Sequence, residues 1–329
     1  MLTLIAAAAA LLSVPANAPP SYSVVGQYQG PDGGWDLLSV DSSHHRLFVG
    51  RGDSVMAVDL SDGKVTGKLL LAERAHAALS VPGTSEVIVT NGSANTAVLA
   101  DGRTGKVRAT IATGMRPDGV AWDPSTKSLW VMNPGDGSIT VIDPVSASVI
   151  ATVPVGGSLE FGAADGKGKL YVTVEDKNEV AVIDTHKRAV IRRDALGSCD
   201  GPTGIVYIPH ERETISACAN GVADVLSEDG HLVASVPIGQ HPDGAVFDAR
   251  RNIVLIPSGT EGVLFVLSAA GTPRVIQRLP TARSARTVAI DPSTGRAYLP
   301  AADLLPTAGT QRPKPEPGTF RILVVAPSY

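Results

Sequence analysis

The feature that most constrains the fold is an internal repeat of about 40 residues. Its third copy, residues 117–156, reads PDGVAWDPSTKSLWVMNPGDGSITVIDPVSASVIATVPVG and contains four short apolar or alternating segments separated by turn residues. Segments of five or six residues with this pattern, each bounded by Gly, Pro, Asn or Asp, predict β-strands. In this copy we expect strands near residues 119–123, 128–132, 138–142 and 148–153.

Seven copies of the repeat align on the position that Asp118 occupies in the third copy. The seven marker residues are Asp36, His76, Asp118, Glu160, Thr203, Asp243 and Arg286, spaced 40 to 43 residues apart. Four strands in a unit of this length are typical of a β-propeller blade. A helical repeat would need two long segments of 3.6-residue periodicity in each unit, and the sequence has none. The repeat therefore predicts an all-β, seven-bladed β-propeller.

The two ends of the chain predict how this ring closes. The last copy has predicted strands near residues 287–291, 296–300 and 320–326, and it lacks a fourth. Residues 22–28, YSVVGQY, precede the first copy and have the pattern of a single strand. We expect this N-terminal strand to join the last blade and close the ring, which removes exposed sheet edges.

The N-terminus has the pattern of an export signal. Residues 2–14 are an apolar run, and Ala16-Asn17-Ala18 supplies the small residues that signal peptidase requires, although no Lys or Arg precedes the run. A run of about 13 residues is too short for a transmembrane anchor, which needs about 20. The sequence predicts a signal peptide at 1–18, a single domain at 19–329 and a periplasmic or secreted protein.

Charge and motifs exclude several function classes. Lys and Arg (28) are scattered among a slight excess of Asp and Glu (32), so we expect no nucleic-acid partner. No G-x-S-x-G, Walker A, G-x-G-x-x-G or H-E-x-x-H motif occurs. The sequence therefore contains no motif that identifies a catalytic centre.

Several segments resemble one known family. KLYVTVEDKNEVAVID at 169–184, SLWVMNPGDGSITVID at 128–143 and the PDG tripeptides at 117–119 and 242–244 are similar to the YncE-like, YVTN-type β-propellers of exported bacterial proteins. The resemblance covers about residues 22–329 and includes a Pro-rich insertion, the long loop at 301–319 of the last blade. It implies a binding protein, and no catalytic residue set carries over.

Propeller geometry places the seven marker residues together at one mouth of the central channel. They form the predicted ligand-binding set: Asp36, His76, Asp118, Glu160, Thr203, Asp243 and Arg286. Four carboxylates this close cannot all remain ionised and unpaired. One hypothesis is a Ca²⁺ or Mg²⁺ site formed by Asp118, Glu160 and Asp243. A second is a polar pocket for a cationic or hydroxyl-rich ligand, and a third is that the acids only accept backbone N–H groups at blade boundaries.

Two further features belong to the same predicted face. Cys199 leads into the first strand of the fifth copy and Cys218 ends its second strand, so export would allow them to form a disulfide. The Pro-rich segment 303–318 is either a flap over the channel mouth or a tolerated surface insertion.

The leading functional hypothesis is an exported propeller that binds a small molecule or an envelope protein on this face. The alternative is a divalent-metal-dependent lactonase-type hydrolase or lyase that uses the channel-mouth carboxylates, with His76 or His241 as acid or base. A third hypothesis is a scaffold for envelope complexes.

Overall fold

The computed structural model describes residues 20–306 and 313–328. The predicted signal peptide, residues 1–18, lies outside them. In the described part of the chain, the structure is all-β apart from one short 3-10 helix, η1 (Glu175–Lys177). No helix there has the length and apolar character needed to cross a membrane.

The strands of the described residues form six antiparallel sheets. One sheet has seven strands in chain order: β2 (Leu38–Asp41), β3 (Arg46–Gly50), β4 (Gly52–Asp59), β5 (Val65–Ser80), β6 (Glu86–Asn91), β7 (Thr96–Asp101) and β8 (Val107–Ala112). The next has β9 (Val120–Asp123), β10 (Ser128–Asn133), β11 (Ser138–Asp143) and β12 (Ser148–Pro154). It is followed by β13 (Leu159–Ala164), β14 (Lys169–Val174), β15 (Glu179–Asp184) and β16 (Ala189–Ala195).

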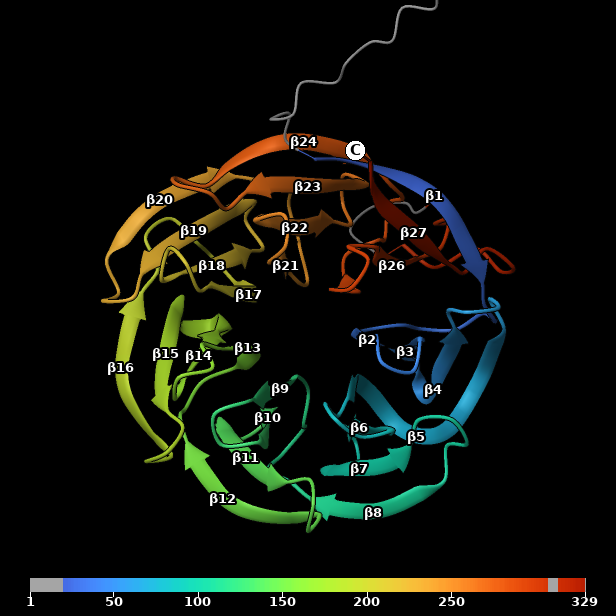
Figure 1. Cartoon of the computed structure of the whole chain (residues 1–329), viewed down its shortest axis with the longest axis horizontal. Coiled ribbons are helices and arrows are strands. Elements are labelled where there is room, and N and C mark those ends of the chain that lie inside the picture. Colours follow the sequence, from blue (N-terminus) through green and yellow to red (C-terminus); the bar gives the residue numbers. More distant parts are fainter. Residues whose placement is uncertain (1–19, 307–312, 329) are drawn as a thin grey trace, which may run out of the picture.

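Three more sheets complete the fold. They are β17 (Pro202–Ile208), β18 (Glu213–Cys218), β19 (Val222–Ser227) and β20 (Leu232–Pro237); then β21 (Val246–Asp248), β22 (Ile253–Ser258), β23 (Val263–Ser268) and β24 (Arg274–Pro280); and finally β25 (Ala289–Ile290), β26 (Ala297–Ala301), β27 (Arg321–Ser328) and β1 (Ser21–Gln29). The sheets are arranged around a central axis, with β9, β13, β17 and β21 nearest to it and β8, β12, β16, β20 and β24 at the periphery (Figure 1).

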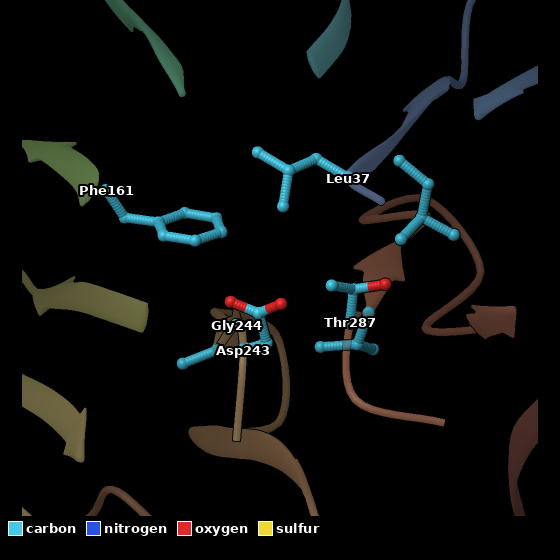
Figure 2. A pocket seen from close by; sticks show the side chains of 8 residues that line it. Leu37, Phe161, Asp243, Gly244 and Thr287 are labelled. Atoms are coloured by element: carbon cyan, nitrogen blue, oxygen red, sulfur yellow. The ribbon is translucent and has the colours of Figure 1, made fainter. Parts of the chain in front are cut away.

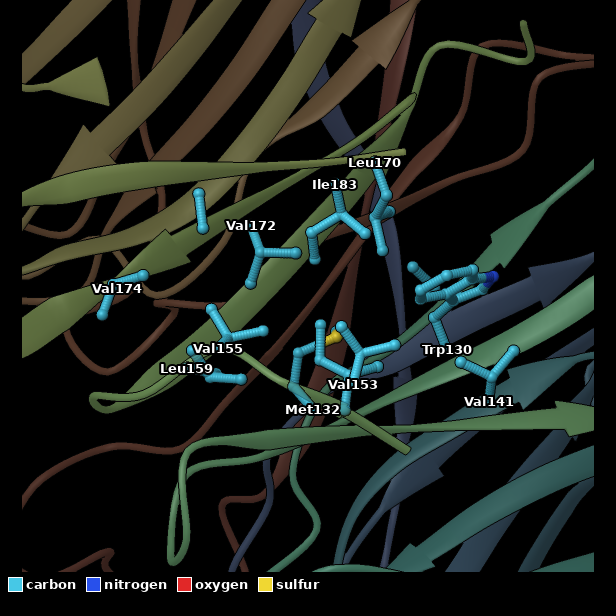
Figure 3. Packing of buried hydrophobic residues seen from close by; sticks show 13 residues of the cluster. Trp130, Met132, Val141, Val153, Val155, Leu159, Leu170, Val172, Val174 and Ile183 are labelled. Atoms are coloured by element: carbon cyan, nitrogen blue, oxygen red, sulfur yellow. The ribbon is translucent and has the colours of Figure 1, made fainter. Parts of the chain in front are cut away.

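The β9–β12 sheet shows why these sequences form strands. Its strands lie within a residue or so of the ranges predicted for the third repeat, which confirms that prediction. All six residues of β10 are buried because other sheets pack against both of its faces, whereas β12 is mostly exposed. Trp130 and Met132 of β10 pack against Leu170 and Val172 of the next sheet, so the core lies between neighbouring sheets (Figure 3).

The seven-stranded sheet owes its size to β5. Residues 65–75 of this strand pair with β4, and residues 75–80 pair with β6. Ala75 is paired on both sides, with Gly52 and with Asn91. The same strand is therefore the last partner of one set of strands and the first partner of the next.

The N-terminal strand β1 pairs with the C-terminal strand β27 from Ser21 to Gln29. Tyr22 is buried, and its hydroxyl donates to Asp248 Oδ2 at 3.0 Å. Its backbone N–H and carbonyl both bond the side-chain amide of Gln277 in β24, at 2.7 Å each. Strand β1 thus connects the first residues of the described chain to the last two sheets.

We predict that deleting residues 19–29 sharply lowers the melting temperature, because β27 loses its outer partner. A sharper test is Tyr22→Ala, which should lower the free energy of unfolding by about 3–5 kcal/mol, as for other buried aromatic truncations. The control is Val25→Ala at an exposed position of the same strand, expected within about 0.5 kcal/mol of wild type. Equal effects of the two substitutions in urea titrations would contradict the anchoring role of Tyr22.

Candidate functional site

The marker residues lie where the chain enters the inner strand of each set. Asp36, Asp118, Asp243 and Arg286 come two or three residues before an inner strand, whereas His76, Glu160 and Thr203 lie within one. These inner strands lie nearest to the central axis (Figure 1), so the segments that enter them also lie close to it.

Hydrogen bonds hold the backbone of these entry residues in place. The N–H of Asp118 donates to Met132 O at 2.9 Å within its own sheet. Its carbonyl accepts the hydroxyl of Thr90, from the preceding sheet, at 2.8 Å. Asp36 has the same arrangement, because its carbonyl accepts the hydroxyl of Thr287 at 3.0 Å. The side chains therefore project from a backbone that is fixed by two sheets.

Five of the marker side chains form a chain of alternating charge. Arg286 Nε lies 2.7 Å from Asp243 Oδ2, and Arg286 Nη2 lies 3.9 Å from Asp36 Oδ1. On its other side, Asp36 Oδ2 lies 2.6 Å from His76 Nδ1, which is 3.7 Å from Asp118 Oδ1. The two basic marker residues thus neutralise part of the acidic ring.

Burial determines how these carboxyls ionise. It raises the pKa of Asp118 to about 6, against the opposing effect of His76, and it raises the pKa of Asp243 despite the ion pair with Arg286. Burial works to lower the pKa of His76, but the hydrogen bond to Asp36 and the nearby Asp118 carboxylate outweigh it, so the His76 pKa is raised.

Glu160 is the most perturbed acid of the cluster. Burial and then the neighbouring carboxylates, Asp118 first among them, raise its pKa to about 9. Within the described residues its carboxyl forms no hydrogen bond or ion pair with protein. At neutral pH this side chain is therefore an uncharged carboxylic acid beside ionised ones.

Thr203 has a different role from the charged marker residues. Its side chain is buried, and its hydroxyl donates to Pro242 O at 2.9 Å, with Ala217 O at 3.3 Å as a second, longer contact. The hydroxyl thus connects two neighbouring sheets in the way that Thr90 and Thr287 do.

Among the described residues, one group has the geometry to hold a metal ion. It consists of Asp36, His76 and Asp118, each offering one ligand atom, with all three atoms within 4.8 Å of one another. The sequence predicted a different set, Asp118, Glu160 and Asp243, and only Asp118 is common to both. Asp243 contributes to the raised pKa of Asp118 through its charge, but neither Asp243 nor Glu160 is a member of this group.

Next to the charged cluster is a small cavity with a largely apolar lining. This cavity, of about 30 Å³, lies beside Asp243 and is lined by Leu37, Phe161, Thr287 and Val288, among others. Figure 2 shows Leu37 and Phe161 facing each other across this space, with the Asp243 carboxylate between them and Thr287. The cavity has room for about one water molecule.

Above the cluster lies a much larger pocket, of about 1820 Å³. One wall is polar and includes Thr203, His241, Asp243, Arg283 and Arg286, with Trp35 beside them. The other wall comes from both arms of the Pro-rich loop and includes Leu304, Leu305, Pro306, Pro313 and Pro315. The described parts of the loop therefore lie at the predicted mouth.

The two arms of this loop hold each other by backbone hydrogen bonds. Leu305 N donates to Lys314 O at 2.9 Å, and Glu316 N donates to Asp303 O at 2.7 Å. The base of the loop is held by an ion pair between Asp303 and Arg321, at 2.8 Å. The sequence indicated the loop but not this pairing, since its proline content argues against a ladder.

Sequence reasoning also missed Trp35 and Arg283, which line the pocket next to Asp36 and Arg286. The segment before Trp35 is held by Arg51, whose guanidinium donates to the carbonyls of Gly34 and Pro31. Burial lowers the pKa of Arg51 to about 10. A tryptophan directly before a marker residue was the one available signal.

A disulfide joins Cys199 and Cys218 at a Cα–Cα distance of 5.4 Å. It connects the segment that enters β17 to the end of β18, on the face that carries the pocket. Cys199 N also donates to Asp224 Oδ2 at 3.1 Å.

The comparisons with known proteins identify a fold. A scan of protein-family models gives no match, and a search of curated proteins also gives none. Among solved structures, the chain is similar to hydrazine synthase of Kuenenia stuttgartiensis, with a TM-score of 0.70, 17% identity, and 81% of this chain and 92% of that chain covered. It is also similar to a chain in the crystal structure of the mitotic checkpoint complex, with a TM-score of 0.78, 13% identity, and 99% and 98% covered. The chain has a β-propeller-like fold.

We predict that Glu160 makes folding stability depend on pH. Because its folded pKa of about 9 lies above the ordinary value of 4.5, the folded state binds more protons, and stability falls as pH rises from about 4.5 to 9. Glu160→Gln should remove this loss. The melting temperature of the variant relative to wild type should therefore increase steadily from pH 5 to pH 9.

The control is Glu73→Gln, at an exposed position. It should leave the pH profile of the melting temperature unchanged. A constant difference between Glu160→Gln and wild type across this range would show that Glu160 titrates normally.

We predict that Cys199→Ala/Cys218→Ala lowers the free energy of unfolding by about 3 kcal/mol, because the disulfide restricts the unfolded chain over a closed loop of about 20 residues. Chemical denaturation under non-reducing conditions measures this loss. Two reactive thiols in the native wild-type protein would contradict the disulfide itself.

Proposed function

We propose that this protein is an exported, seven-bladed β-propeller of the YncE-like type that binds an extended ligand on its channel-mouth face. The count of seven treats the seven-stranded sheet as two blades that share β5, which pairs with β4 in its first part and with β6 in its second. Closure of the ring is supported by the pairing of β1 with β27. The proposed location is the periplasm or the exterior, which suits a disulfide-bonded domain.

The large pocket is the observation that carries the binding function. Pockets for small molecules are typically about 300–1,000 Å³, and this one, at about 1820 Å³, is larger. Its size and its position over several sheets favour a peptide segment of an envelope protein over a single small metabolite.

The two walls of the pocket suit such a ligand. The Leu and Pro side chains of the loop arms can pack against apolar residues of a peptide. On the opposite wall, Arg283 and His241 are exposed, and neither side chain forms a hydrogen bond or ion pair with the described residues. They are available to acceptor groups such as backbone carbonyls or carboxylates.

The surroundings of His76 favour binding over nucleophilic catalysis. An activated nucleophile needs its hydroxyl or thiol within hydrogen-bond reach of the base. In the described part of the chain, the side-chain partners of His76 Nδ1 are two carboxylates, those of Asp36 and Asp118. This imidazole is therefore placed to compensate charge.

The test uses a library of random peptides displayed on phage and selected on the purified protein. A matched variant replaces residues 305–314 with Gly-Gly, which removes Leu305, Pro306 and Pro313 from one wall of the pocket. The replacement is feasible because Leu305 N and Lys314 O lie 2.9 Å apart. A second variant, Arg283→Glu, reverses one charge on the opposite wall.

We predict that peptides selected on the wild type lose at least about tenfold in affinity for both variants. Lys187→Glu, in an exposed turn between β15 and β16, is the control and should bind as the wild type does. Equal binding by all four proteins, or no peptide enrichment on the wild type, would overturn the proposed peptide-binding function.

A further inference from the structure

The side chains of Asp36, His76 and Asp118 converge from the entry segments of three consecutive inner strands. Asp36 precedes β2, His76 lies in the inner part of β5, and Asp118 precedes β9. One ligand atom from each lies within 4.8 Å of the other two. None of the three lines the large pocket, so this cluster is distinct from the proposed peptide site.

The spacing of these atoms is close to that of ligands on one metal ion. Zinc lies about 2.0–2.2 Å from imidazole nitrogen and carboxylate oxygen, so two ligands of a tetrahedral site are about 3.4 Å apart. His76 Nδ1 lies 3.7 Å from Asp118 Oδ1. It lies 2.6 Å from Asp36 Oδ2, and this contact would lengthen by somewhat less than 1 Å when an ion replaces the shared proton.

The orientation of the imidazole is set by a glycine. A Cβ on Gly92 would lie 2.9 Å from His76 Cδ2 and 3.0 Å from Nε2, so only glycine leaves room for this edge of the ring. The opposite edge, with Nδ1, therefore faces the two carboxylates. The backbone hydrogen bonds of Asp36 and Asp118 hold the other two ligands from the sheet, which is the kind of support that metal sites require.

The carboxylate of Asp118 lacks a close partner. Among the described residues it forms one ion pair, with the His76 imidazole at 3.7 Å, and its side chain forms no hydrogen bond. Asp243, by contrast, is paired with Arg286 at 2.7 Å. The partly buried Asp118 thus has lone pairs available for a cation.

We propose that Asp36, His76 and Asp118 bind a divalent transition-metal ion of the Zn²⁺ or Mn²⁺ class. The donor set decides the class, because Ca²⁺ takes six to eight oxygen ligands and Mg²⁺ is bound mainly through carboxylates and water. One imidazole with two carboxylates suits Zn²⁺ or Mn²⁺ instead. Three protein ligands leave at least one coordination position for water or for a group of a bound ligand.

The experiment is titration of the untagged protein with Zn²⁺, Mn²⁺, Ca²⁺ and Mg²⁺ by calorimetry, with metal content measured after dialysis. We expect one Zn²⁺ or Mn²⁺ per chain and at least about tenfold weaker binding of Ca²⁺ and Mg²⁺. Substitution with Co²⁺ adds a spectroscopic readout, because its visible absorption changes when an imidazole coordinates the ion.

Four variants test the assignment of ligands. His76→Gln and Asp118→Asn should lose at least about a hundredfold in Zn²⁺ or Mn²⁺ affinity, whereas Asp243→Asn, outside the group, should lose less than about tenfold. Gly92→Ala keeps all three ligands but displaces the ring, and it should weaken binding by about 10- to 100-fold. The melting temperature of each apo variant shows whether it is folded.

Absence of metal binding by the wild type would overturn the proposal, as would unchanged binding by His76→Gln. Loss of binding in Asp243→Asn and Glu160→Gln with retention in His76→Gln would also overturn it, in favour of the three-carboxylate site. Peptide selection does not require metal, so failure of the peptide-binding proposal would be seen separately.

Discussion

Threonine hydroxyls cross between neighbouring sheets close to the axis, and the site depends on these bonds. Thr90 reaches the carbonyl of Asp118, Thr173 that of Thr203, Thr203 that of Pro242, and Thr287 that of Asp36. Each bond fixes the backbone at the entry to an inner strand and contributes about 1 kcal/mol net. Because the entry segments cannot move apart, the charged side chains that they carry must share one small volume.

That confinement explains the composition of the cluster. Acids held together in a partly buried site must be paired with bases or protonated. Arg286 pairs with Asp243 and His76 with Asp36, while Glu160 takes up a proton. At three marker positions Asp is therefore replaced by a residue that limits the negative charge of the cluster. These residues are His76, Glu160 and Arg286. Thr203 replaces Asp for another reason, because its hydroxyl forms one of the hydrogen bonds between neighbouring sheets.

The strands and the gathering of the marker residues could be predicted from the sequence because both follow from a repeat with a two-residue side-chain period. The sequence could not predict that residues 65–80 form one continuous strand. That continuity depends on the pairing of β5 with β4 on one edge and with β6 on the other. The large pocket could not be predicted from the sequence either. Trp35 and Arg283 reach it from segments without a strong pattern, and the pairing of Asp303 with Glu316 joins two arms of a proline-rich loop.

The central claim is that residues from different repeats act as one coupled electrostatic cluster at the channel mouth. The most direct test is a double-mutant cycle between Asp36 and His76 in urea unfolding at neutral pH, using Asp36→Ala, His76→Ala and the double variant. A charge-assisted hydrogen bond of 2.6 Å predicts a coupling free energy of at least about 0.5 kcal/mol. Additivity of the two substitutions within about 0.3 kcal/mol would show that the two side chains do not interact and would contradict the cluster.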